Sequence, residues 1–173
     1  MPGVSRSRRI SLPLFVLVAF FFAAAVIAGQ SHSVADPWLR PDQAPAPSDN
    51  LPTSARVELG QMLFFDPRLS RKANMSCASC HNPALGWSDG LPTATGFEMK
   101  TLARATPTIL NTAFNPIQMW DGRKSTLEDQ ALGPIAADGE MNMPLPEMVE
   151  RLKSIHGYAK KFEEATPAKA SRR

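Results

Sequence analysis

The stretch Cys77-Ala78-Ser79-Cys80-His81 contains both cysteines of the 173-residue chain. Two thiols at this spacing on one helical turn can add to the two vinyl groups of a haem, and the histidine that follows then binds the iron. A redox dithiol or half of a zinc site would use the same pair, but no βαβ pattern surrounds it and the chain has no further thiols for zinc. The motif therefore predicts one covalent haem c, attached through Cys77 and Cys80 with His81 as an axial iron ligand.

Residues 1–35 have the pattern of an export signal. Three arginines precede an apolar run over residues 10–28. Cleavage after Ala28 or Ala35 fits the small-residue rule of signal peptides, while the run is also nearly long enough to span a bilayer. We therefore expect a signal peptide or an N-terminal membrane anchor, and a location in the periplasm.

The basic charge of the chain gives no evidence of a nucleic-acid partner. The sequence has 19 Lys and Arg against 16 Asp and Glu, and removing the three arginines of the export signal leaves sixteen residues of each sign. A domain with balanced charge lacks the positive field that attracts a polyanion. No nucleic acid is expected among its partners.

The remaining chain divides into a linker, a domain and a tail. Residues 36–52 contain five prolines and form a Pro-rich linker with an extended backbone. The domain spans 53–165 and begins with a helix capped by Thr53 or Ser54 and stopped by Pro67. Its expected apolar face comprises Val57, Leu59, Met62, Leu63 and Phe65. Residues 166–173 are polar and basic without periodicity, so we expect a disordered tail.

Two further helices are expected in the second half of the domain. Ser125 and Glu128 have the spacing of a capping box, and the helix they begin should end near Gly133 and Pro134. The next helix has one apolar face before Gly157, and an i, i+4 pair after Gly157 favours its continuation. That face comprises Met148, Val149, Leu152 and Ile155, and the pair is Tyr158 and Phe162. Residues 69–108 should be mostly loop that wraps the haem. No strand pattern or repeat appears, so the fold class is mostly α with long loops.

The sixth position of the iron separates electron transfer from catalysis. A methionine or a second histidine fills this position in a carrier, whereas an empty position admits a small oxidant. His32 and His156 are weak ligand candidates, because the first lies at the edge of the export signal and the second favours a surface position. Met141 and Met143 follow His81 at a distance typical of small electron-transfer cytochromes c, although methionines in helical proteins more often pack in the core.

From about Leu59 to Phe162, six groups of residues recur in the order of a known family. They are Leu59-Gly60 to Phe65-Asp66-Pro67-Arg68-Leu69-Ser70, Cys77 to Asn82, Pro107-Thr108-Ile109-Leu110-Asn111, Trp120-Asp121-Gly122-Arg123, Gln130 with Gly133-Pro134-Ile135, and Glu140-Met141-Asn142. In these segments the chain resembles the N-terminal, peroxidatic-haem domain of the bacterial di-haem cytochrome c peroxidases and of their relatives that mature methylamine dehydrogenase. The resemblance implies a single cytochrome c-like haem domain that reduces hydrogen peroxide.

The same resemblance implies roles for individual residues. His81 would be the proximal ligand, Glu140 the distal acid/base, Gln130 its polar neighbour, and Trp120 the aromatic residue between two haems. A carboxylate above the iron can take a proton from one peroxide oxygen and return it to the other. From the residues alone, a solvated loop carboxylate is the favoured interpretation of Glu140. Trp120 alone would be a core aromatic, a packing role that is compatible with electron relay. The electron donor would be a small redox protein such as a cytochrome c or a cupredoxin.

Three departures from the family pattern bear on function. Many of these peroxidases have a removable distal histidine in a Gly-His pair, where this chain has Gly96-Phe97, so no imidazole can block the iron. Ala105 replaces an asparagine that helps bind an interdomain calcium, which leaves calcium doubtful. The second haem domain is absent from these 173 residues, so a separate second-haem domain is a possible partner.

The sequence thus leads to a c-type haem peroxidase domain. A monohaem electron carrier with Met141 or Met143 as the sixth ligand is the main alternative. An inactive truncated fragment of a di-haem peroxidase is the other.

Overall fold

The computed structural model describes residues 41–166. The export signal expected over 1–35, the first part of the linker and all but one residue of the expected tail lie outside the described residues. From Gln43 onward the described chain belongs to one compact unit. Residues 43–52, the later part of the linker, are exposed and contain no helix. The end of this segment still contacts the domain, because Asn50 Nδ2 donates to Glu128 Oε1 at 2.9 Å.

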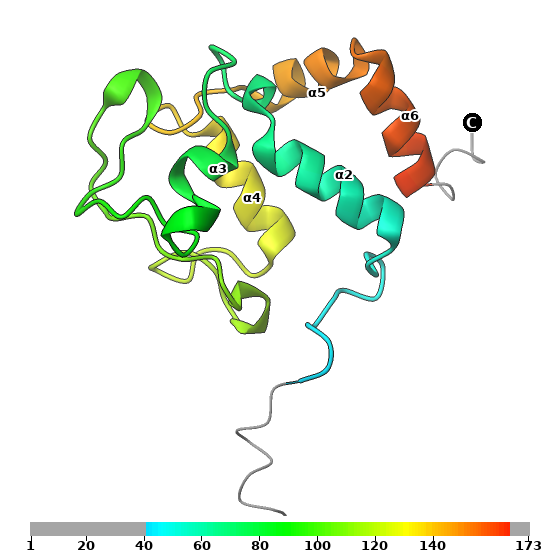
Figure 1. The fold of residues 1–173 in the computed structure, drawn as a ribbon, viewed down its shortest axis with the longest axis horizontal. Helices are drawn as coiled ribbons and strands as arrows, with labels where there is room; N and C mark the ends of the chain where they lie inside the picture. Colours follow the sequence, from blue (N-terminus) through cyan, green and yellow to red (C-terminus); the bar gives the residue numbers. More distant parts are fainter. Residues whose placement is uncertain (1–40, 167–173) are drawn as a thin grey trace, which may run out of the picture. The chain divides into compact units, whose positions relative to one another are not determined.

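The described fold is helical with long loops (Figure 1). The helices are α2 (Ser54–Phe65), α3 (Cys77–Cys80), α4 (Leu127–Ala136), α5 (Leu145–Lys153) and α6 (His156–Ala165). Between residues 41 and 166 the only β pairing consists of isolated bridges, which confirms the mostly α prediction for this part of the chain. None of the helices formed by these residues is long and apolar enough to cross a membrane.

Helix α2 begins where the sequence predicts, but its apolar face is narrower than expected. Thr53 is the N-cap, and its side chain accepts a hydrogen bond from the backbone nitrogen of Arg56. Leu59 is buried and Leu63 is partly buried, because these residues, one turn apart, face the rest of the domain. The other three members of the expected face, Val57, Met62 and Phe65, are exposed because their positions turn them away from that side.

Helix α4 begins one residue later and ends later than predicted. Its N-cap is Thr126, whose side chain accepts from the backbone nitrogen of Asp129, and not Ser125 paired with Glu128. The helix also continues past Pro134 to Ala136. A proline removes a single i→i−4 hydrogen bond, and the bond from Ala137 N to Gly133 O at 2.9 Å closes the following turn.

The structure forms two helices where the sequence predicts one last helix. Helix α5 ends at Lys153, and α6 begins at His156, so Gly157 lies in the first turn of α6 and does not end a helix. The Ser154 hydroxyl donates to Arg151 O at 2.7 Å, which is a local bond that competes with continuation of the helix. Leu152 and Tyr158 are buried as the pattern suggested, whereas Val149 is exposed.

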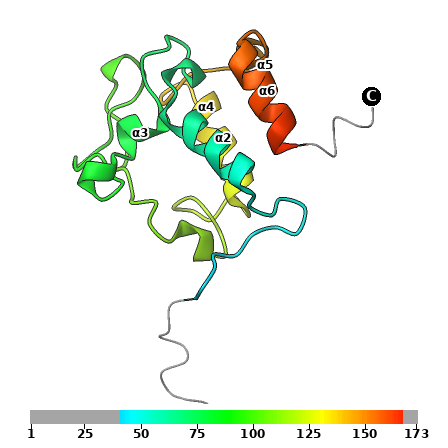
Figure 2. The same cartoon turned by 45° about the vertical axis from the view of Figure 1, so that its right-hand side comes forward.

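The core lies among α2, α4, α5 and α6. Figures 1 and 2 both place α6 next to α2, and these two helices are in contact. The buried residues of this core are Leu59, Leu69, Ile135, Met141, Met143, Leu152, Tyr158 and Ala165. Cys77 and Met75 are partly buried and pack against it, so the cysteine motif is attached directly to the helical core.

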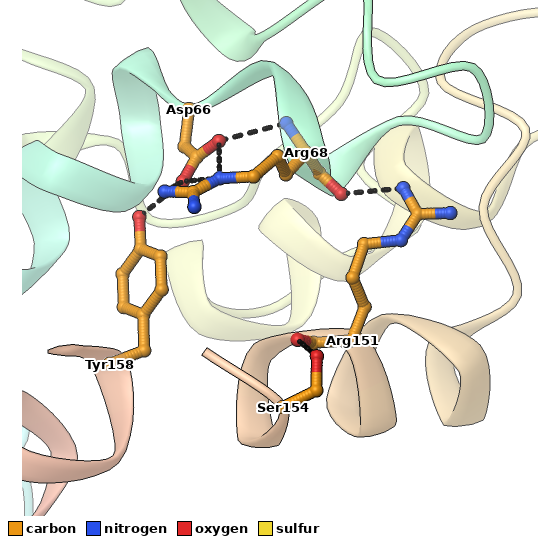
Figure 3. A network of polar contacts seen from close by, with 5 residues as sticks. All are labelled: Asp66, Arg68, Arg151, Ser154 and Tyr158. Carbon is orange, nitrogen blue, oxygen red and sulfur yellow. Dashed lines mark hydrogen bonds and ion pairs between the residues drawn. The ribbon is translucent and has the colours of Figure 1, made fainter. Parts of the chain in front are cut away.

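A polar network fixes the turn that follows α2 (Figure 3). Oδ2 of Asp66 accepts hydrogen bonds from Tyr158 Oη and Arg68 Nη2, both at 2.6 Å. Arg151 Nη1, on α5, donates to Arg68 O at 2.9 Å and to Ser70 O at 2.7 Å. The network joins α5 and α6 to the chain that leads into the cysteine motif.

Candidate functional site

The cysteine motif forms a single helical turn. Helix α3 contains both thiols, and the bond from His81 N to Cys77 O at 2.9 Å closes the turn on the histidine. The Ser76 backbone nitrogen donates to Ser79 Oγ at 2.9 Å, which satisfies a donor at the start of the turn. Both cysteines are free and half-buried. Burial raises the pKa of each thiol, so both are protonated at neutral pH.

The imidazole of His81 has one nitrogen engaged by the protein. Nδ1 lies 3.1 Å from the carbonyl oxygen of Trp87, an acceptor that favours the tautomer with a proton on Nδ1. Nε2 then has a free lone pair for a metal ion. A haem c needs two thiols on one helical turn, followed by a histidine whose Nε2 can bind iron. The residues present therefore fit this cofactor.

Glu140 lies in the same part of the molecule as the motif. Its side chain is half-buried, and burial raises its pKa, while the electrostatic influence of Arg123 and, less strongly, of His81 opposes that rise. The charge of Glu140 in turn contributes to the raised pKa of the Cys80 thiol. The fold thus brings Glu140 within electrostatic range of His81 and Cys80, whereas a freely solvated loop carboxylate would have no raised pKa.

Backbone contacts hold the Glu140 loop from two sides. Arg71 N donates to Met141 O at 3.0 Å, and Arg71 Nε donates to Asn142 O at 2.9 Å. On the other side, Phe97 N donates to Gly139 O at 2.9 Å. The position of Glu140 therefore depends on the residues that precede α3 and on the loop that contains Phe97.

Gly96 and Phe97 occupy a tight junction beside this loop. A Cβ at residue 96 would lie 1.9 Å from Gly139 O, so only glycine allows the two backbones to approach this closely. Phe97 is buried, and the ammonium of Lys72 lies 5.4 Å from the centre of its ring. Glu98 and Met99 both have left-handed backbone conformations, and Lys72 Nζ bonds to Glu98 Oε1 at 2.6 Å.

Gln130 contacts Met119, the residue that precedes Trp120 in the sequence. Gln130 is half-buried on α4, and its Nε2 is 3.8 Å from Met119 Sδ, so the amide of this expected neighbour of Glu140 bonds to a different residue. Trp120 is 86% exposed, which rules out a core aromatic. It precedes a turn in which Arg123 Nη1 bonds to both carboxylate oxygens of Asp121 at 2.8 Å.

The candidates for a sixth iron ligand differ in burial. Met141 and Met143 are both buried in the helical core, where packing accounts for them. His156 is exposed at the start of α6, in agreement with a surface histidine. His32 lies outside the described residues.

Sequence reasoning missed the loop that holds the imidazole of His81. Trp87 acts through its backbone carbonyl, which has no sequence signature. Two threonines brace the same loop: Thr108 Oγ1 donates to Gly86 O at 2.6 Å, and Thr106 Oγ1 donates to Asp89 Oδ2 at 2.8 Å. The segments that carry the family resemblance include Thr108 but imply no role for it. Its presence there was the one signal in the sequence that pointed to this loop.

Comparison with known proteins identifies relatives of the whole described domain. A profile of the family Di-haem cytochrome c peroxidase matches residues 54–173. The chain is 45% identical over 175 residues to Methylamine utilization protein MauG of Methylorubrum extorquens, with 91% of this chain and 50% of that protein covered. It is 38% identical over 159 residues to Cytochrome c551 peroxidase of Pseudomonas aeruginosa, with 90% of this chain and 46% of that protein covered. The chain thus spans about half the length of these relatives.

Solved structures of similar fold are also MauG-like and diheme peroxidase proteins. A MauG-like protein associated with microbial copper homeostasis superposes with a TM-score of 0.67 at 29% identity, over 76% of this chain and 40% of that one. The diheme peroxidase BthA of Burkholderia thailandensis superposes with a TM-score of 0.60 at 25% identity, over 66% of this chain and 33% of that one. The profile match covers well over half of the sequence, and the folds agree. The chain therefore belongs to the di-haem cytochrome c peroxidase family.

Proposed function

We propose that this chain is a periplasmic peroxidase domain that carries one haem c and reduces hydrogen peroxide to water. Membership of a cytochrome c peroxidase family implies covalently bound haem c. The observation that carries the proposal is the half-buried Glu140 in electrostatic range of His81. An acid/base group and a haem-binding motif in one region are what peroxide cleavage requires.

In this proposal, Cys77 and Cys80 attach the haem and the Nε2 atom of His81 binds its iron. The bound haem supplies the site at which peroxide binds and through which electrons reach the O–O bond. A carboxylate oxygen of Glu140 takes the proton from one peroxide oxygen and delivers it to the oxygen that departs as water. Partial burial favours the protonated form of Glu140 and so assists the delivery step.

Phe97 supports a haem pocket in which no imidazole occupies the sixth position of the iron, even before any reduction. A phenyl ring has no nitrogen with which to bind iron, and this ring is buried in contact with Lys72. Peroxide would then need no earlier reduction step to displace an imidazole. Packing in the helical core accounts for Met141 and Met143 without a role as iron ligands, which leaves the electron carrier as the alternative.

Electrons would enter near Trp120. Reduction of peroxide to water consumes two electrons, and the 173 residues contain one haem motif. Trp120 is exposed, and other apolar side chains of the same segment are exposed with it, namely Leu110, Phe114 and Ile117. This surface suits a separate second-haem domain or a small donor such as a cytochrome c or a cupredoxin. Calcium is not part of the proposal, because Ala105 offers no side-chain oxygen.

The chain would reach the periplasm by means of residues 1–35, as a soluble protein after cleavage or tethered by an uncleaved segment. Haem is added to such proteins after export, and the Pro-rich segment over 36–52 would then separate the domain from the membrane.

Expression of the full chain with a c-type maturation system tests the proposal. The wild type should give a haem-stained band that survives denaturation, whereas Cys77→Ala with Cys80→Ala should give none. The reduced protein should bind carbon monoxide, and it should consume peroxide when a reduced cytochrome c is supplied. Haem that washes out would overturn the attachment, and a reduced protein that excludes carbon monoxide would favour the electron carrier. Attached haem that is inert toward peroxide would identify an inactive fragment.

A further inference from the structure

The seven residues after His81, Asn82 to Ser88, form a small closed loop. Asn82 and Ser88 pair as an antiparallel bridge, with Asn82 N donating to Ser88 O at 3.1 Å. Inside the loop, Trp87 N donates to Asn82 O at 2.9 Å, and Ala84 N donates to Asn82 Oδ1 at 2.9 Å. The loop presents the Trp87 carbonyl to His81 Nδ1 at 3.1 Å.

The backbone of this loop is held in an unfavourable conformation. Gly86 and Trp87 are consecutive left-handed residues, with φ values of 65° and 63°. Glycine adopts this conformation freely, but a bulky residue does so only when surrounding contacts enforce it. One such contact is the Trp87 ring, which packs edge-to-face against Phe64 of α2 with ring centres 5.7 Å apart.

Two threonines from a distant segment supply the other contacts. Thr108 Oγ1 donates to the Gly86 carbonyl at 2.6 Å, which fixes the peptide plane immediately before Trp87. Ser88 Oγ donates to Thr106 O at 2.8 Å, which anchors the residue immediately after it. Thr106 is itself buried and bonded to Asp89. Both neighbours of Trp87 are therefore held from residues 106–108.

We propose that Thr108 is a positioning residue for the iron ligand His81. The direction of the Trp87 carbonyl is set by the peptide planes on either side of it, and the Thr108 hydroxyl fixes one of them. This inference rests on the proposed function, in which His81 binds haem iron. Thr108 touches neither the haem nor peroxide, so it acts only through the loop.

The chemical consequence follows from the bond to Nδ1. A histidine that donates this proton to a well-placed acceptor is a stronger electron donor to its metal. A stronger donor stabilises the oxidised iron and lowers its reduction potential. Loss of the Thr108 hydroxyl should let the Gly86 carbonyl turn, weaken the bond from His81 to Trp87, and raise the reduction potential.

The test uses the haem-loaded full chain in four forms: wild type, Thr108→Val, Thr108→Ser and Thr112→Val. Valine keeps the shape of threonine and removes its hydroxyl, while serine keeps the hydroxyl. Thr112 is the matched control, because its Oγ1 also donates to a loop carbonyl, that of Ile109 at 3.0 Å, outside the loop that holds His81. The readouts are the reduction potential and the iron–histidine stretching frequency in the resonance Raman spectrum of the ferrous protein.

Thr108→Val should raise the potential and lower the stretching frequency, while Thr108→Ser and Thr112→Val should match the wild type. Phe64→Leu, which removes the ring contact to Trp87, should shift both quantities in the direction of Thr108→Val. Unchanged values in Thr108→Val and Phe64→Leu with haem attached would overturn the inference alone. A wild type without covalent haem, or without an iron–histidine band, would overturn the proposed function and this inference with it.

Discussion

The phenolic oxygen of Tyr158 lies 2.6 Å from Oδ2 of Asp66, across 92 positions of sequence. Asp66 also accepts four hydrogen bonds from Arg68, one from its backbone nitrogen and three from its guanidinium, and is almost fully buried. These donors hold the pKa of Asp66 at about 2, and burial together with the nearby carboxylate raises that of Tyr158 to about 12. The contact fixes α6 against the turn that leads toward the haem motif (Figure 3).

The depressed pKa of Asp66 predicts acid-sensitive stability. An unfolded aspartate titrates near 3.9, so the ionised carboxylate stabilises the fold fully above about pH 4. That stabilisation is lost as the pH falls from about 4 to about 2. Asp66→Asn should lower the free energy of unfolding by about 2 kcal/mol at pH 7, with the difference disappearing near pH 2. Urea denaturation of both proteins over this pH range measures the effect.

Asp121→Asn is the matched control. Asp121 also bonds to an arginine two residues later, at 2.8 Å, but both side chains are about half exposed. Exposed ion pairs contribute little, because water and salt screen them. Equal losses of stability in the two variants would contradict the role given to burial and to Tyr158.

The start of α2 was predictable because capping is local, whereas the break between α5 and α6 was not. Thr53 and the backbone nitrogen that it caps are three residues apart, so the sequence contains the whole signal. The apolar spacing of residues 148–162 is compatible with one helix. The break instead places Tyr158 beside Asp66, and local periodicity does not contain a contact between such distant residues.

The candidate site also combines features that the local sequence predicts with features that it does not. The spacing of Cys77, Cys80 and His81 is a local signal, and the structure forms the expected turn. The position of Glu140 near His81 came only from family resemblance, since the loops between them determine it. The bracing of His81 by Trp87 and Thr108 depends on backbone carbonyls, for which no residue type is diagnostic.

Gly96→Ala should destabilise the protein by displacing the Glu140 loop. The added Cβ would lie 1.9 Å from Gly139 O, and the two backbones must separate to admit it. We expect a loss of about 1–3 kcal/mol, typical of overpacking, together with slower reaction with peroxide. Denaturation and rapid mixing measure the two effects.

Gly60→Ala is the control for this substitution. Gly60 lies within α2 with nothing within 4 Å of the added Cβ. Alanine in a helix should raise stability by about 0.5–1 kcal/mol and leave the peroxide reaction unchanged. Equal stability of Gly96→Ala and the wild type would refute the close approach of the two loops.

Phe97→His should restore an imidazole where many of the peroxidases have one. With phenylalanine at this position, we expect the ferric haem of the wild type to be largely high-spin without prior reduction. The histidine variant should move toward a low-spin spectrum, measured optically and by electron paramagnetic resonance. Phe97→Leu keeps an apolar side chain and should remain high-spin. A low-spin wild type that is insensitive to Met141→Ala and Met143→Ala would contradict both the open pocket and methionine ligation.

The raised pKa of Glu140 gives a pH signature for its proposed role. Burial favours the protonated form, so the carboxylate becomes available as a base only above the ordinary range of a glutamate, about 4.3. The reaction with peroxide should therefore become faster as the pH rises through this shifted value. A variant without an ionisable group at residue 140 should show no such increase in rate with pH.

Glu140→Gln should slow the reaction with peroxide by about a hundred- to ten-thousand-fold, the usual contribution of a positioned acid/base group. Glutamine keeps the size and polarity of the side chain but can neither take nor return the proton, and it touches neither cysteine, so the haem-stained band should be unchanged. Rapid mixing with peroxide across the pH range measures both the rate and its pH step. Glu150→Gln, at an exposed position on α5 where the carboxylate pairs with Lys153, is the control and should behave as the wild type. Equal rates for Glu140→Gln and the wild type would remove Glu140 from the mechanism, because the remaining residues would then move the proton without it.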